Sequence, residues 1–130
     1  MKLRKLVVAV AVAALGSLAV ASMVRADDAD GDGVRNSRDQ CANSDLTSIV
    51  VIGSCDTGVP NVVDKRFKSK GGIPGCSIMD FVAICLATST TDKQFEQCVK
   101  DVGEFFRDAG LIDGQQARKV FQCGQNLNAL

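Results

Sequence analysis

The stretch "CSIMDFVAICLATSTTDKQFEQC", from Cys76 to Cys98, contains the signals that decide the fold. Ser77 is followed three residues later by Asp80, a carboxylate variant of the capping box, which predicts a helix over residues 78–88. This helix is apolar on nearly every side, through Ile78, Met79, Phe81, Val82, Ile84, Cys85 and Leu86. We therefore expect it to lie between two other helices.

A second helix is predicted to begin after Thr91, which is followed by Gln94 at the capping-box spacing, and to end at Gly110. Its apolar residues recur at the spacing of one helical face, which predicts an amphipathic helix. These residues are Phe95, Cys98, Val99, Val102, Phe105, Phe106 and Ala109.

A third helix is predicted between Asp113, which with Gln116 caps its start, and Gly124, which ends it. Its inward-facing residues are predicted to be Ala117, Val120 and Phe121. We therefore predict a mainly α fold, in which residues 76–130 form a cysteine-rich bundle of about three helices. A bundle this short has a marginal hydrophobic core, so covalent cross-links would contribute to its stability.

The chain has no histidine and six cysteines: Cys41, Cys55, Cys76, Cys85, Cys98 and Cys123. An even number of cysteines in a short exported chain predicts a disulfide framework. The alternative, a metal site made of thiolates, requires closely spaced pairs and usually histidines. The closest two cysteines here are separated by eight residues, so we expect all six to form disulfides.

The pairing follows from the predicted helices and from elimination. Cys85 and Cys98 would meet across an antiparallel pair of helices. Cys76 does not reach Cys85, because the helix between them rises ~13 Å and a disulfide needs Cα atoms within ~7 Å. The first two cysteines would close a short loop around a strand, worth ~3 kcal/mol. The predicted pairs are Cys41–Cys55, Cys85–Cys98 and Cys76–Cys123.

Residues 42–75 contain one strand signal and several turn signals. Thr47–Ile52 is rich in β-branched residues and is followed by glycine and serine, which predicts a short strand. Residues 59–75 include "GGIPG" and are predicted to be a linker. The linker contains the basic sequence "DKRFKSK", which is either a solvated segment or a docking site for an anionic polysaccharide, a teichoic acid, a lipid headgroup or the acidic loop itself. We expect Phe67 to be partly buried against the first helix.

The stretch "DDADGDGVRNSRDQC", from Asp27 to Cys41, concentrates five aspartates in a short segment. A calcium loop places oxygen ligands at alternating positions and at its end, with glycine at the sharp turn. The matching residues are Asp28, Asp30, Asp32, Val34 through its carbonyl oxygen, Asn36 and Asp39, with Gly33 at the turn. The carboxylates repel one another until a divalent cation binds, so the pattern predicts Ca²⁺ as cofactor and partner.

The pattern D-x-D-x-D-G-x-x-N-x-x-D-x-C resembles the thrombospondin type 3 repeat, which is also found in linkers of the outer-membrane protein A family. The resemblance implies the side-chain ligands Asp28, Asp30, Asp32, Asn36 and Asp39. The repeat usually has Asp in place of Asn36, and often Pro in place of Ala42. Its copies usually stand in tandem and share ions. Because this chain has one copy, we expect weak binding, on the order of 10⁻⁴–10⁻³ M.

The resemblance extends more loosely along the chain. The spacing from Cys41 to Cys55 is similar to the disulfide-closed tail of such repeats, which sets residues 27–58 apart as a calcium loop with its strand. "CDTGVPN", "GCSIMDF" and "FEQCV" are similar to a small module that follows single type 3 repeats in bacterial secreted proteins. This similarity implies no activity.

Three other interpretations fit the acidic stretch less well. A solvated acidic linker would not need glycine and oxygen-bearing residues at these positions. Magnesium requires a smaller octahedral shell and keeps its waters, so calcium is favoured. An EF-hand needs an entering helix, and no helix fits between the predicted cleavage site and Asp28.

Residues 1–26 are predicted to be a signal peptide, because three basic residues precede an apolar run over residues 6–24. Cleavage is predicted after Ala26, with Ala21 as the second possibility and an uncleaved membrane anchor as the alternative. The remaining chain has 11 basic and 15 acidic residues, a net charge of −4, which argues against nucleic-acid binding. We expect a secreted, periplasmic or cell-surface protein.

The sequence contains no catalytic constellation. Without histidine there is no Ser-His-Asp triad, Cys-His pair or common zinc-hydrolase site. We therefore predict a protein that is not an enzyme, with a hydrolase as the least favoured class. The first hypothesis is a secreted calcium-binding structural or interaction module, whose partner would be another extracellular protein or a cell-surface polymer. The second is a disulfide-stapled adhesin or inhibitor in which calcium has no role.

Overall fold

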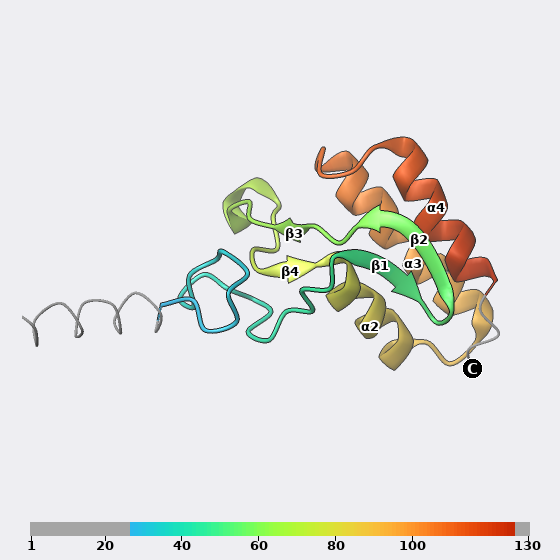
Figure 1. The fold of residues 1–130 in the computed structure, drawn as a ribbon, viewed down its shortest axis with the longest axis horizontal. Helices are drawn as coiled ribbons and strands as arrows, with labels where there is room; N and C mark the ends of the chain where they lie inside the picture. The colour runs from blue at the N-terminus through green and yellow to red at the C-terminus, as the bar shows by residue number, and fades with distance from the viewer. Residues whose placement is uncertain (1–26, 127–130) are drawn as a thin grey trace, which may run out of the picture.

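The computed structural model describes residues 27–126, so the predicted signal peptide lies outside the described residues. Three α-helices follow one another in the second half of the chain: α2 (Ile78–Thr88), α3 (Asp92–Asp108) and α4 (Gly114–Gln125). The first half contains β1 (Ile49–Ile52), β2 (Cys55–Pro60), β3 (Val63–Asp64), the 3₁₀-helix η1 (Lys68–Lys70) and β4 (Cys76–Ser77). Figure 1 shows the acidic loop at one end of the molecule and the helices at the other.

All three helices begin where the capping signals predict. In α2, the Asp80 N–H donates to Ser77 Oγ (3.2 Å) and the Ser77 N–H donates to Asp80 Oδ2 (2.8 Å), a complete capping box. Asp113 and Gln116 form the same complete capping box at the start of α4. At the start of α3 the Thr91 hydroxyl accepts from the Gln94 N–H, but the Gln94 side chain accepts from the Thr90 N–H, so the box there is incomplete. The prediction of three capped helices is therefore confirmed.

The order of packing differs from the prediction, because α3 lies between α2 and α4 (Figure 1). The amphipathic α3 buries Phe95, Val99 and Phe106, whereas α2 leaves Ile84 50% exposed and Leu86 48% exposed. Gly124 does not end α4 but lies within it, where a Cβ would meet Val99 at 2.9 Å, so the glycine allows close packing of α4 on α3.

The fold is less helical than predicted, because two small antiparallel sheets accompany the helices. β1 confirms most of the predicted strand, and it forms a hairpin with β2, where the sequence indicated turns. Gly58 and Pro60 suggested that no strand forms there, but Pro60 stands at the end of a two-stranded sheet, where proline is tolerated. Val50 and Val59 from this hairpin are fully buried in the core formed with the helices.

The predicted linker, residues 59–75, contains the end of β2, all of β3 and η1. β3 pairs with β4, so this segment folds back on itself before α2 begins. Asp64 in β3 is fully buried. The segment thus contains regular secondary structure and a buried charged residue.

The three disulfides are Cys41–Cys76, Cys55–Cys123 and Cys85–Cys98. The predicted Cys85–Cys98 pair is confirmed, and the predicted Cys41–Cys55 and Cys76–Cys123 pairs are wrong. The acidic loop packs on the turn before β4, which brings Cys41 to Cys76, and β2 packs on α4, which brings Cys55 to Cys123. Elimination failed because the sequence does not reveal that these two segments fold back in this way.

The two long-range pairs can be tested directly. Digestion of the oxidised, unreduced protein with a protease specific for aspartate separates the six cysteines into different peptides. Mass spectrometry should then find Cys41 joined to Cys76 and Cys55 joined to Cys123. A peptide pair joining Cys41 to Cys55 would contradict the structure.

Removing the Cys55–Cys123 bond by double alanine substitution should lower the free energy of unfolding by about 4 kcal/mol, measured with denaturant.

Candidate cation site

The acidic loop is wound by its own side chains, which accept hydrogen bonds from backbone N–H groups. Asp28 accepts from Gly31 (2.9 Å) and from Gly33 (3.0 Å) through its two carboxylate oxygens. The Val34 N–H donates to Asp32 Oδ1 at 2.6 Å. Gly33 has a φ of 86°, a conformation that favours glycine, so the sharp turn predicted there is present.

This winding brings three predicted ligands together. One carboxylate oxygen from each of Asp28, Asp30 and Asp32 lies within 4.8 Å of the others. Asp32 is only 5% exposed. The pKa of Asp30 is lowered, chiefly because its carboxylate accepts a hydrogen bond from the Ser44 N–H at 2.9 Å. The group is therefore a compact set of three carboxylates that lie close enough to repel one another.

Asp39, the predicted last ligand, has an unsatisfied oxygen. Its Oδ1 accepts from the Cys41 N–H at 2.8 Å, but its Oδ2 is buried and has no hydrogen-bond partner. Burial raises the pKa of Asp39, and the charges of Asp32, Asp30 and Asp28 raise it further, against the lowering effect of the Cys41 hydrogen bond. A buried carboxylate oxygen without a partner is costly, so this residue is in an unfavourable environment when it is charged.

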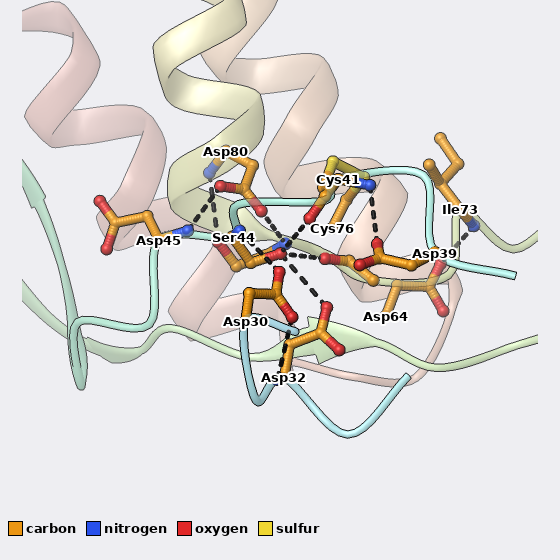
Figure 2. The surroundings of a disulfide bond; sticks show 12 residues. Asp30, Asp32, Asp39, Cys41, Ser44, Asp45, Asp64, Ile73, Cys76 and Asp80 are labelled. Carbon is orange, nitrogen blue, oxygen red and sulfur yellow. Dashed lines mark hydrogen bonds between the residues drawn. A yellow bond between two sulfur atoms is a disulfide. The ribbon is translucent and has the colours of Figure 1, made fainter. Parts of the chain in front are cut away.

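The body of the domain contributes two more oxygen-bearing groups to this region (Figure 2). The Ser44 hydroxyl contacts Asp32 Oδ2 (3.3 Å), the Cys41 carbonyl oxygen (3.0 Å) and the Gly75 carbonyl oxygen. A Cβ on Gly75 would clash with Asp39 Oδ1 and would lie 3.1 Å from Asp32 Oδ2. Asp32 and Asp39 therefore approach the same side of the turn that precedes β4.

Sequence reasoning missed Ser44 and Gly75. The "GGIPG" motif indicated a turn, but its position beside the acidic loop depends on the Cys41–Cys76 disulfide, which was not predicted. The other two predicted ligands, Asn36 and Val34, are described by their place within the acidic loop. Asn36 accepts from the Ala29 N–H at 3.0 Å, which closes the loop. Val34 is only 1% exposed.

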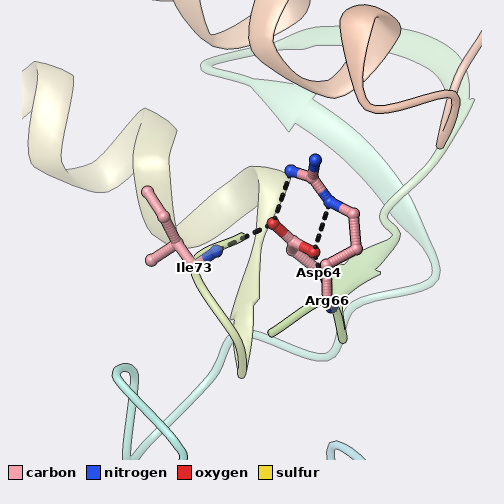
Figure 3. Close-up of polar contacts among 3 residues, drawn as sticks. All are labelled: Asp64, Arg66 and Ile73. Atoms are coloured by element: carbon pink, nitrogen blue, oxygen red, sulfur yellow. Dashed lines mark hydrogen bonds and ion pairs between the residues drawn. The ribbon is translucent and has the colours of Figure 1, made fainter. Parts of the chain in front are cut away.

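Asp64 is a second buried carboxylate, and all its hydrogen bonds are satisfied (Figure 3). Arg66 donates to it from Nε (3.0 Å), from Nη2 (2.9 Å) and from its backbone N–H (2.9 Å), and the Ile73 N–H donates at 2.9 Å. Burial raises the pKa of Asp64, but these hydrogen bonds and the Arg66 charge outweigh it, so the pKa is lowered overall. The Gly75 N–H donates to the Asp64 carbonyl oxygen (2.8 Å), so this cluster also fixes the turn beside Asp39.

Comparison with protein-family models, with curated proteins and with solved structures finds no match for this chain. The resemblance of the acidic loop to the thrombospondin type 3 repeat therefore stays a prediction from the sequence. Within residues 27–126, no helix combines the length and the apolar character needed to cross a membrane.

Replacing Asp64 with Asn should destabilise the protein by about 3 kcal/mol at neutral pH, because Arg66 would lose its charged partner. A carboxylate with a lowered folded-state pKa stabilises the fold above its unfolded pKa of about 3.9. That stabilisation is lost as the pH falls through the lower, folded pKa. The difference between wild type and variant in denaturant unfolding should therefore shrink below about pH 4.

Asp108→Asn is the matched control for this substitution. Asp108 forms its ion pair with Arg107 on the exposed surface of α3, so its loss should leave the unfolding midpoint unchanged. Equal destabilisation by the two substitutions would show that the Asp64 cluster has no special role.

Proposed function

We propose that the chain is an exported module in which Ca²⁺ orders an acidic loop beside a disulfide-stapled helical domain. The observation that carries this proposal is the buried, unpartnered Oδ2 of Asp39, a residue whose pKa is raised by burial and by the nearby charges of Asp32, Asp30 and Asp28. A divalent cation would neutralise these carboxylates and would supply the partner that the buried oxygen lacks. The same cation would relieve the repulsion within the triplet.

The ligands we assign are the carboxylates of Asp28, Asp30, Asp32 and Asp39. Ca²⁺ takes six to eight oxygens at about 2.3–2.6 Å, and it accepts carbonyl and hydroxyl oxygens as well as carboxylates. The Val34 carbonyl oxygen and Asn36 are further ligands that the repeat pattern implies. Calcium is favoured over magnesium because this donor set is rich in protein oxygens, whereas magnesium keeps several waters.

In tandem repeats of the thrombospondin type 3 kind, neighbouring copies share ions. Here the single loop is contacted by Ser44 and by Gly75 of the turn before β4, which lie against Asp32 and Asp39. We infer that the domain itself supports the single loop. Affinity in the range of extracellular modules, on the order of 10⁻⁴–10⁻³ M, would suit an exported protein.

The proposed location outside the cytoplasm is supported by the three disulfides, which persist in oxidising compartments. It is also supported by the signal peptide predicted from the sequence. We propose a structural or interaction role without catalysis, since the chain has no histidine and all its cysteines are in disulfides. The proposed partner is an extracellular protein or a cell-surface polymer.

Calorimetric titration of the oxidised protein with Ca²⁺ at millimolar concentration tests the proposal. Binding heat should be measurable, and the double substitution Asp30→Ala with Asp32→Ala should abolish it. The control is Asp101→Ala with Asp108→Ala, which removes the same charge from the exposed surface of α3 and should leave the heat unchanged. Absence of heat from the wild-type protein would sink the calcium assignment.

The substitution Asp39→Asn tests two effects separately: destabilisation of the metal-free fold by the Asp39 charge, and binding of Ca²⁺ by Asp39. Because the folded-state pKa of Asp39 is raised, its charge destabilises the metal-free fold at pH values above that pKa. The variant should therefore melt at a higher temperature than wild type in chelator, yet gain less stability when Ca²⁺ is added. Equal calcium-induced shifts in melting temperature for both proteins would exclude Asp39 as a ligand.

The second candidate function, a protein-binding domain in which calcium has no role, is supported by a different surface. Leu46, Val51, Ile84 and Leu86 are large hydrophobic residues that each expose more than a third of their surface. A groove of about 190 Å³ lies between β1 and α2, with Val51 and Leu86 among its lining residues. Exposed apolar surface of this kind is typical of contact sites. The calcium titration above distinguishes the two functions.

A further inference from the structure

We propose that a pocket between the acidic loop and η1 binds the acidic sugar of an anionic glycan. The pocket has a volume of about 300 Å³. We call it the Phe67 pocket and define it by Ser37, Arg38, Gln40, Phe67, Lys68 and Ser69. The inference goes beyond the calcium site, since none of the six residues is among the calcium ligands assigned above.

The two walls of the Phe67 pocket are fixed to each other. The Gln40 N–H donates to the Pro74 carbonyl oxygen at 2.8 Å, and the Cys41–Cys76 disulfide follows directly in the chain. The guanidinium carbon of Arg38 lies 4.3 Å from the ring centroid of Phe67, which joins the walls by a cation–π contact. The pocket is therefore formed before any ligand arrives, which lowers the entropy cost of binding.

The pocket is lined by positively charged side chains. Arg38 and Lys68 line it, and Lys65 and Lys70 flank Phe67 in the sequence. None of the ion pairs found among residues 27–126 includes any of these four. Arg66 contributes no free charge here, because its guanidinium is bound to Asp64. Arginine in particular suits a carboxylate or sulfate group, which it can hold through two parallel hydrogen bonds.

The rest of the lining matches a sugar ring. Ser37 and Ser69 offer hydroxyl groups and Gln40 offers an amide, which can pair with sugar hydroxyls. Phe67 is 53% exposed, and its ring, with Arg38 over it, lines the pocket as an apolar surface. A few placed polar groups around an apolar surface are the usual composition of a small-ligand site.

A membrane surface fits these features less well. Membrane binding through a surface segment needs a broad apolar face beside the basic residues. In the described residues, Phe67 is the one large exposed hydrophobic side chain of this region, since the others belong to the segment before β1, to β1 and to α2. A concave site lined with hydroxyl groups favours a discrete ligand.

The test uses a tetrasaccharide of alternating glucuronate and N-acetylglucosamine, titrated into the oxidised protein and followed by calorimetry and by amide NMR shifts. The same sugar with its carboxylates reduced to alcohols is the uncharged probe. The acidic sugar should bind and shift the amides around Phe67, and the reduced sugar should bind at least about tenfold more weakly.

Three variants locate the binding. Arg38→Gln and Lys68→Gln should each weaken binding about tenfold, and Phe67→Leu should weaken it while leaving the charge unchanged. Lys93→Gln removes the same charge from exposed α3 and should bind like wild type. Melting temperatures of all variants should match wild type, because these side chains are exposed.

The titrations are run with Ca²⁺ and with chelator, so that failure of the calcium site is seen separately. Binding in both conditions, or only with Ca²⁺, supports the pocket. If Arg38→Gln and Lys93→Gln lowered the affinity for the sugar equally, the binding would depend on overall charge alone, and the proposal would be overturned. Absence of sugar binding in both conditions would overturn the proposal as well, whether or not the protein binds vesicles of phosphatidylglycerol.

Discussion

The acidic loop contains no regular secondary structure before β1, and its position depends on its attachment to the turn that precedes β4. The Cys41–Cys76 disulfide makes this attachment covalent, and the Gln40 N–H to Pro74 hydrogen bond continues it. A loop held only by its own side chains would have to lose much conformational entropy on folding. The cross-link removes part of that cost and brings oxygen atoms from distant parts of the sequence together. The candidate cation site and the Phe67 pocket both lie along this seam.

Asp64 and Asp39, two carboxylates beside the seam, have opposite environments. Asp64 is surrounded by donors and by Arg66, so its charge is stabilised, whereas Asp39 has a buried oxygen that no donor reaches. Both oxygens of Asp64 accept hydrogen bonds, whereas one oxygen of Asp39 accepts none. The unfavourable electrostatic energy is therefore concentrated at Asp39. Such strain is typical of sites that are completed by a ligand. This contrast supports the calcium proposal more strongly than the number of aspartates does.

Local signals in the sequence predicted local structure well. Ser77 with Asp80 and Asp113 with Gln116 define helix starts because the capping interactions act within a few residues. Cys85 and Cys98 could be paired because the two helices that carry them are adjacent. The acidic repeat pattern likewise predicted the glycine turn and the grouping of three aspartates, since both arise inside one loop.

Features that depend on long-range packing could not be predicted in the same way. The β2 strand forms because it pairs with β1, and the local sequence does not show this pairing. Gly58 and Pro60 alone therefore predicted turns in place of a strand. Packing of β2 on α4 then decides the Cys55–Cys123 pair, and no local signal indicates it. Gly75 joined the candidate site for the same reason, because its neighbours there are more than thirty residues away in the sequence.

The pairing of the disulfides has a topological consequence for a protein exposed to proteases. The Cys41–Cys76 and Cys55–Cys123 bonds interleave along the chain, since each encloses one cysteine of the other. Any single peptide bond broken between Cys41 and Cys123 is therefore bridged by at least one of them. A nicked molecule would stay in one piece, and its two fragments would remain close enough to keep their packing.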